Sequence, residues 1–173
     1  MAGVGRRALE QIRCAVFGVW CGIWTVRGEE RVIAAVSGAV YGCIDKRTGE
    51  QALLTVMTAS CLTAGVKSAV RRLRPYAAGV VTRVDIDAPL VSTTDLDADM
   101  SFPSGHATAT GGFFTSLALR FRRPLCIALC AAFTLLVMLS RLYFGVHYPT
   151  DVLTGLLIGA WCAFFWQLVY VKW

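Results

Sequence analysis

The chain contains two histidines, and both lie among residues that could carry out acid–base or nucleophilic chemistry. His106 ends the stretch Pro103-Ser104-Gly105-His106, directly before an apolar run. His147 precedes the pair Tyr148-Pro149, and Asp151 follows shortly after. Because a residue before proline is pushed out of the helical region, His147 should lie just before a helix and Asp151 in its first turn. A carboxylate there can accept a hydrogen bond from one imidazole nitrogen, which fixes the tautomer and leaves the other nitrogen free to act.

Each of these features also has a purely structural explanation when it is taken alone. Asp151 would compensate a helix dipole, Ser104 would cap a helix, and a histidine at a membrane interface needs no function. These explanations do not account for Gly105 and His106 beside the cap, nor for both histidines lying in polar clusters at one predicted face. A helix N-terminus with free N–H groups, and a glycine that permits close approach, suits an anion.

A further polar cluster, Lys67 to Pro75, follows directly on an apolar segment. Lys67, Arg71 and Arg74 are spaced i, i+4, i+7, so we expect them to share one face of a helix. They could form a basic collar whose side chains extend to the membrane interface. Alternatively, they converge on an anion, because arginine offers a planar fork for phosphate oxygens and lysine a point charge.

The chain that must position these residues is far more apolar than a soluble domain. Of its 173 residues, 56% are hydrophobic and 16% are charged, and the mean hydropathy is +0.59. Soluble domains are about 45–50% apolar and about 25% charged. We therefore predict one integral membrane domain over residues 1–173. The net charge of +6 is scattered between apolar runs, which argues against a nucleic-acid partner.

Apolar segments along the chain predict an all-α fold, a bundle of six transmembrane helices, because lipid-exposed loops cannot cross hydrocarbon. The expected segments are 12–26, 32–44, 52–70, 104–120, 124–142 and 149–171. The first two are short for a full span. Residues 45–49 and 120–124 should separate neighbouring helices. Arginines precede the first segment and no clear cleavage site follows it, so we expect a retained helix.

The basic residues orient the predicted bundle. If both termini lie in the cytoplasm, the other cations in the loops lie mostly inside. The Lys67–Arg74 cluster and Arg141 then lie outside. That placement opposes the positive-inside rule unless these residues serve a site. Segments three and five would end outside, and four and six would begin there, so the polar clusters should meet at the outer face. The aspartate-rich loop 76–100 would lie there too, as a solvated surface or, alternatively, a divalent-ion site.

Together, the clusters resemble the tripartite signature of the type 2 phosphatidic acid phosphatase (PAP2) superfamily, which includes membrane lipid phosphatases and soluble vanadium haloperoxidases. The matching positions are Lys67-x6-Arg74-Pro75, then Pro103-Ser104-Gly105-His106, then Ser140-Arg141-x5-His147-x3-Asp151. They occur in the family's order over residues 67–151, and every signature position is filled. The resemblance implies a helical core like that of the haloperoxidases and a phosphatase that needs no metal or other cofactor.

The resemblance also implies a role for each matching residue. His147 would be the nucleophile and form a phosphohistidine, Asp151 would orient and activate it, and His106 would protonate the leaving oxygen and later activate water. The residues that would hold the phosphate oxygens are Lys67, Arg74, Arg141, Ser104 and the Gly105 backbone N–H. Arg71 lies outside the family signature, and we add it as a candidate because it shares the predicted stripe with Lys67.

We therefore predict a lipid phosphatase in a bacterial cytoplasmic membrane, with its active site facing outside and the lipid tail between helices. An isoprenoid diphosphate such as undecaprenyl diphosphate is the favoured substrate. Phosphatidylglycerol phosphate, phosphatidic acid and lipid A phosphates are alternatives, because the motifs bind phosphate and the helices bind a generic chain. Two other classes are a vanadate-dependent haloperoxidase, which the membrane helices disfavour, and an inactive lipid-phosphate-binding or scaffolding protein, which the filled signature disfavours.

Overall fold

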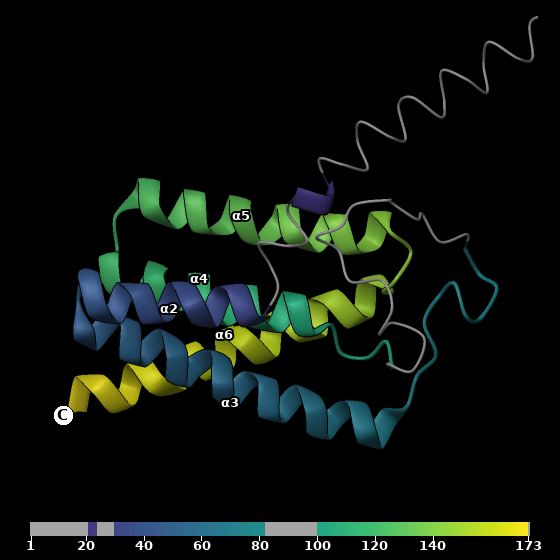
Figure 1. The fold of residues 1–173 in the computed structure, drawn as a ribbon, viewed down its shortest axis with the longest axis horizontal. Coiled ribbons are helices and arrows are strands. Elements are labelled where there is room, and N and C mark those ends of the chain that lie inside the picture. Colours follow the sequence, from purple (N-terminus) through teal and green to yellow (C-terminus); the bar gives the residue numbers. More distant parts are fainter. Residues whose placement is uncertain (1–20, 24–29, 82–99, 173) are drawn as a thin grey trace, which may run out of the picture.

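The computed structural model describes residues 21–23, 30–81 and 100–172, and within these ranges it is helical and contains no strand. After a helical stretch at 21–23, the helices are α2 (Glu30–Cys43), α3 (Lys46–Val70), α4 (Gly105–Phe121), α5 (Pro124–Tyr143) and α6 (Pro149–Lys172), drawn in Figure 1. The predicted all-α fold is confirmed. Most of the predicted segment 12–26 and most of the aspartate-rich loop lie outside the described residues.

Within the described part of the chain, α3, α5 and the Pro149–Val171 portion of α6 are long and apolar enough to cross a membrane. The 17 residues of α4 extend about 26 Å, and α2 contributes the shorter apolar stretch Val32–Cys43. Large apolar side chains cover the outside of the bundle, among them Leu125, Leu157 and Trp161. Such a surface needs hydrocarbon around it, so the chain is an integral membrane protein.

The boundary between α2 and α3 differs from the prediction, because residues 46–49 belong to the first turn of α3 instead of separating the helices. Asp45 caps this helix: its carboxylate accepts a hydrogen bond from the Arg47 N–H at 3.3 Å and another from the Thr48 hydroxyl. The same carboxylate forms an ion pair with Arg120 at 3.2 Å, near the end of α4. The polar residues at this position therefore start a helix and tie it to α4.

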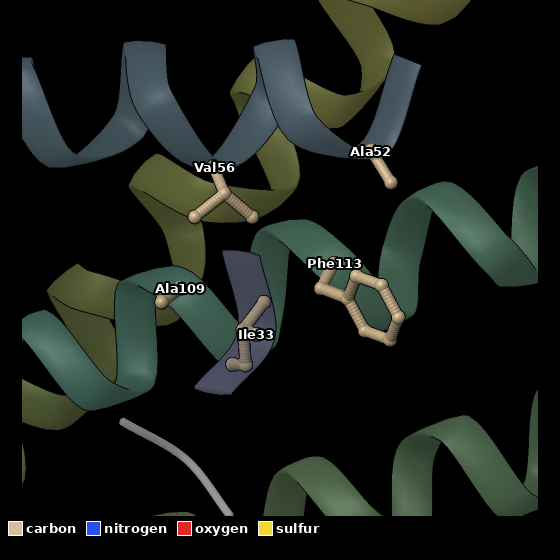
Figure 2. Packing of buried hydrophobic residues seen from close by; sticks show 5 residues of the cluster. All are labelled: Ile33, Ala52, Val56, Ala109 and Phe113. Atoms are coloured by element: carbon tan, nitrogen blue, oxygen red, sulfur yellow. The ribbon is translucent and has the colours of Figure 1, made fainter. Parts of the chain in front are cut away.

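A core of small and medium side chains joins α2, α3 and α4. Figure 2 shows Ile33 from α2, Ala52 and Val56 from α3, and Ala109 and Phe113 from α4, all buried. Hydroxyl groups also connect α3 and α4: Ser116 donates to Thr55 at 3.2 Å, and Thr63 donates to Thr108 at 3.2 Å. Such interhelical hydrogen bonds satisfy polar groups that cannot reach water in a membrane bundle.

Among the described helices, α4 and α6 have the most extensive contact, and glycines make this approach possible. A Cβ atom on Gly159 would lie 2.2 Å from the Thr108 carbonyl oxygen and 2.5 Å from the Gly112 nitrogen. A Cβ atom on Gly155 would lie 2.6 Å from the Ser104 carbonyl oxygen. These are backbone atoms, so the helices would have to separate to admit a side chain. The glycines of α6, opposite the small residues at 107–112 of α4, therefore allow close helix packing.

Replacing Gly159 by alanine should separate α4 from α6 and lower the melting temperature in detergent, with a loss of about 1–3 kcal/mol. Gly65→Ala is the matched control, because a Cβ atom at this helical position meets nothing within 4 Å. It should leave stability unchanged or raise it by about 0.5–1 kcal/mol. Equal melting temperatures for the two variants would contradict the packing argument.

Candidate functional site

The predicted polar clusters meet at one end of the bundle, where α3 and α5 end and α4 and α6 begin (Figure 1). Arg74, after α3, donates to the Val146 carbonyl at 3.2 Å, in the loop between α5 and α6. The Ser104 N–H donates to the Asp151 carbonyl at 3.0 Å and so joins the start of α4 to α6. The expectation that segments distant in sequence converge here is confirmed.

His147 lies in the loop between α5 and α6, and its side chain is 3% exposed. Its Nδ1 atom is 2.8 Å from the Ser101 carbonyl oxygen and 3.7 Å from an Asp151 carboxylate oxygen. A carbonyl oxygen can only accept a hydrogen bond, so Nδ1 carries the proton and, in the neutral ring, Nε2 carries the lone pair. The sequence suggested that Asp151 accepts the hydrogen bond from this imidazole. In the structure the Ser101 carbonyl is the nearer acceptor, and Asp151 lies at ion-pair distance.

Asp151 is completely buried in the first turn of α6. One carboxylate oxygen accepts a hydrogen bond from Arg72 Nη1 at 3.0 Å, and the other accepts one from the Tyr148 N–H at 2.9 Å. A buried carboxylate without such partners would carry a large desolvation cost. Arg72 and the backbone therefore stabilise the negative charge beside His147.

The electrostatic surroundings keep His147 neutral. Burial lowers its pKa to about 4, and the positive charges of Arg141 and Arg74 act in the same direction, while Asp151 opposes them. The imidazole is therefore unprotonated at neutral pH, with a lone pair available on Nε2. A neutral imidazole in this state can act as a nucleophile or as a general base.

Cations surround the two histidines. Arg74 and Arg141 are buried, and Lys67 is half-buried in the last turn of α3. His106, in the first turn of α4, experiences the charges of Arg141, Arg74 and Lys67, and it also interacts electrostatically with His147. This concentration of positive charge beside a helix N-terminus can hold an anion with several oxygens, such as a phosphate group.

Ser104 and Gly105 form the start of α4. The buried Ser104 caps the helix, and its hydroxyl oxygen lies 3.5 Å from the Ala107 nitrogen. Its carbonyl accepts hydrogen bonds from the Thr108 hydroxyl at 2.9 Å and from the Thr108 N–H at 3.0 Å. Gly105 follows as the first helical residue and is half-buried, at the end of α4 that faces the cations.

The basic stretch after α3 is arranged differently from the prediction. The helix ends at Val70, so Lys67, Arg71 and Arg74 do not share one helical face, and that prediction is wrong. Arg71 is exposed, has a left-handed backbone with φ of 49°, and donates from Nε to the Ser68 carbonyl at 3.0 Å. The turn directs the next residue, Arg72, to Asp151.

Two residues that touch this centre, Ser101 and Arg72, had no role assigned from the sequence. Charge placement counted Arg72 among the basic residues that could serve a site, but it gave this residue no function. Ser101 is buried, donates its N–H to the Arg72 carbonyl at 2.8 Å, and donates its hydroxyl to the Leu73 carbonyl at 3.1 Å. The atom of Ser101 that contacts His147 is the backbone carbonyl oxygen, and the identity of a side chain does not reveal the role of a backbone atom. Arg72 was recognisable as a member of the basic cluster, but helical spacing favoured Arg71.

An apolar cavity of about 680 Å³ lies between α4, α5 and α6. Its lining begins with Met138 and Leu153, which lie close in sequence to Arg141 and Asp151. It continues away from the polar end along the residues Leu156, Ala131, Leu135, Phe114, Leu119 and Phe164. Volumes of this size are typical of ligand sites. The cavity thus offers an apolar chain a place beneath the polar centre.

Comparison with known proteins gives a consistent family relationship. A model described as the PAP2 superfamily matches residues 50–173. A decaprenylphosphoryl-5-phosphoribose phosphatase from Mycobacterium tuberculosis is 32% identical over 144 residues, covering 83% of this chain and 70% of the relative. A lipid A 1-phosphatase from Rhizobium etli is 40% identical over 72 residues, covering 42% of this chain but only 30% of the relative.

The fold is also shared with a solved structure. The transmembrane PAP2 type phosphatidylglycerolphosphate phosphatase from Bacillus subtilis superposes with a TM-score of 0.68. The superposition covers 98% of this chain and 87% of the other at 23% sequence identity. At this level of identity the likeness concerns the fold.

The lowered pKa of His147 predicts an acid-sensitive fold. As the pH falls below 6.5, the unfolded chain binds a proton on this imidazole that the folded protein accepts only near pH 4. The free energy of unfolding should fall by up to about 3 kcal/mol across this window. At higher pH, this histidine should not change the stability. His147→Asn should therefore lose less stability than the wild type between pH 7 and pH 4.5, measured by melting temperature in detergent. An identical pH dependence in the two proteins would contradict the assignment.

Proposed function

Because the chain belongs to the PAP2 superfamily, we propose that it is a metal-independent lipid phosphatase that works through a phosphohistidine on His147. The observation that carries the proposal is the neutral, buried His147, whose Nδ1 is held by the Ser101 carbonyl while cations gather around the ring. Phosphoryl transfer needs little beyond in-line positioning and charge stabilisation, and both are available here.

In the proposed reaction, His147 Nε2 attacks phosphorus in line with the scissile P–O bond, and a P–N bond forms as that P–O bond breaks. The protonated form of His106 gives its proton to the leaving oxygen. Neutral His106 then takes a proton from water, whose oxygen attacks the phosphohistidine and releases phosphate together with free His147. The groups that hold the phosphate oxygens are Lys67, Arg74, Arg141, Ser104 and the Gly105 N–H.

The position of Asp151 supports a role in orienting this nucleophile. Its carboxylate lies 3.7 Å from His147 Nδ1 and would attract the imidazolium-like charge that develops when Nε2 forms a bond. Arg71 stays a weaker candidate for phosphate binding, because its side chain is exposed and turned toward the end of α3. An arriving headgroup could still meet it at the surface.

We propose an isoprenoid diphosphate, such as undecaprenyl diphosphate, as the substrate. The match to a decaprenylphosphoryl-5-phosphoribose phosphatase over 83% of the chain favours a polyprenyl lipid. The same match makes a phosphomonoester on a polyprenyl-linked sugar the second candidate. The apolar cavity beneath the site would hold the first part of such a tail.

We propose that the site faces the outer side of the cytoplasmic membrane. The end of the bundle opposite the site carries several exposed cations: Lys46, Arg47, Arg120, Arg122 and Arg123. Cations in short loops favour the cytoplasmic side. This end would therefore lie in the cytoplasm and would place both histidines at the other surface.

A panel of lipid phosphates tests the reaction. The protein, purified in detergent with a chelator, should release phosphate from a polyprenyl diphosphate or polyprenyl phosphosugar, and His147→Ala should reduce kcat by about 1,000-fold or more. Arg123→Ala, at the opposite end, is the control and should retain activity. Metal-free activity that survives in His147→Ala would refute the nucleophile assignment, and a panel without any hydrolysed member would refute the phosphatase.

The cavity can be tested with two adjacent alanines on α5. Both alanines are exposed, but Ala131 lines the cavity and Ala132 is not part of the lining. Ala131→Phe should raise KM for a long-chain substrate about 10-fold, which corresponds to about 1.4 kcal/mol of lost binding. Hydrolysis of a water-soluble short-chain diphosphate should stay unchanged, as should both reactions in Ala132→Phe. Equal KM values for the two variants would show that the tail lies elsewhere.

A further inference from the structure

We propose that Arg72 is a positioning residue for this phosphoryl transfer, because its guanidinium group holds the carboxylate of Asp151 in place beside His147. The inference rests on the proposed function and adds a residue to it. Arg72 is not part of the sequence signature that the chain shares with the superfamily, and the sequence placed it in the basic cluster without assigning it a role.

The side chain of Arg72 is held from three directions. Nη1 donates to Asp151 at 3.0 Å and to the Thr150 hydroxyl at 2.9 Å. The guanidinium carbon lies 3.9 Å from the centre of the Tyr148 ring, which is a cation–π contact. All three partners belong to the segment that carries His147 into α6. Arg72 is thereby attached to the segment whose geometry the reaction requires.

The two oxygens of Asp151 have different partners, and this difference fixes the rotation of the carboxylate. Oδ1 accepts the hydrogen bond from Arg72, while Oδ2 accepts one from the Tyr148 N–H and lies 3.7 Å from His147 Nδ1. Without Arg72, the buried Oδ1 would lose the guanidinium group that donates to it. The carboxylate would then lose both a charge partner and a constraint on its orientation.

The backbone of Arg72 connects to the other partner of His147. The Arg72 carbonyl accepts a hydrogen bond from the Ser101 N–H at 2.8 Å, and the Ser101 carbonyl accepts one from His147 Nδ1 at 2.8 Å. Arg72 therefore stabilises both groups that face Nδ1, one through its side chain and one through its main chain. Only the side-chain link is removed by substitution.

The charges that face His147 predict how its protonation responds. Asp151 favours the imidazolium, whereas Arg141 and Arg74 disfavour it, and His106 lies within electrostatic range. Removing the Arg72 guanidinium deletes a positive charge that balances Asp151. The imidazolium form of His147 should become easier to form, so the acid limb of the pH–rate profile should move to higher pH by about one unit.

Kinetics of Arg72→Ala and Arg72→Lys test the positioning role. Arg72→Ala should lower kcat about 10- to 100-fold, because a small displacement of a reacting group can cost about 100-fold, and it should leave KM within about 3-fold. Arg72→Lys should fall between Arg72→Ala and wild type, because it keeps the charge without the planar fork. The Arg72 side chain is 38% exposed, so added guanidinium should reach the site and restore part of the activity of Arg72→Ala. Arg123→Ala, treated in the same way, should show neither the loss nor the rescue.

Two kinetic results would overturn the inference. One is a kcat of Arg72→Ala within 2-fold of wild type, and the other is a loss confined to KM, which would make Arg72 a substrate-binding residue. If Arg72→Ala does not give a monodisperse protein in detergent, Arg72→Lys decides through the same kcat and KM readouts, because it removes the planar fork while keeping the charge.

A measurement without substrate separates this inference from the proposed function. Since the chain contains two histidines, a histidine-labelled sample gives two imidazole spin systems in NMR, and a His106→Gln sample assigns them. The His147 titration should move to higher pH in Arg72→Ala, where the positive charge is lost, and an unmoved or lowered midpoint in this variant would overturn the inference. Arg72→Lys keeps the charge and should show a smaller shift. A wild-type protein that hydrolyses no lipid phosphate would refute the proposed function, while this titration would still decide the role of Arg72.

Discussion

The buried charge of Asp151 is the interaction on which the polar end of the bundle depends. Its carboxylate binds Arg72 and the Tyr148 N–H, and its backbone carbonyl accepts a hydrogen bond from Ser104. Each of the polar clusters therefore contacts this residue or lies beside it. A carboxylate buried without these partners would cost several kcal/mol, so the loops after α3 and before α4 must be in place for the charge to be tolerated.

The close approach of α4 and α6 provides the rigid frame for this centre. Gly155 and Gly159 bring the α6 backbone against the carbonyl oxygens of Ser104 and Thr108, because neither glycine carries a side chain that would hold the two helices apart. Both helices begin at the polar end, so their N-terminal dipoles add to the field of the nearby cations. The same packing brings Ser104 within hydrogen-bond distance of Asp151, which links helix geometry to site geometry.

The same helices must be apolar along their length, where they face hydrocarbon, and polar at the end that forms the site. Along their length, α5 and α6 expose large apolar residues such as Leu125 and Leu157, and hydroxyl groups between α3 and α4 bond to one another. At the polar end, charges are buried and paired. The cavity between α4, α5 and α6 runs from that end into the apolar region, an arrangement suited to a molecule with an anionic head and a hydrocarbon tail.

The sequence by itself determined that the chain is helical and membrane-embedded, because long apolar runs have few alternatives in a bilayer, and it placed the polar clusters at one end. Only the tertiary structure decided which atoms meet there. The left-handed turn at Arg71 directs Arg72 to Asp151, and the Ser101 carbonyl lies closer to His147 Nδ1 than the carboxylate does. Side-chain patterns could not reveal these contacts, because every residue has a backbone carbonyl and a helix can end one turn earlier than its charge spacing suggests. The proposed roles of the site residues stay predictions, but their convergence is a consequence of the fold.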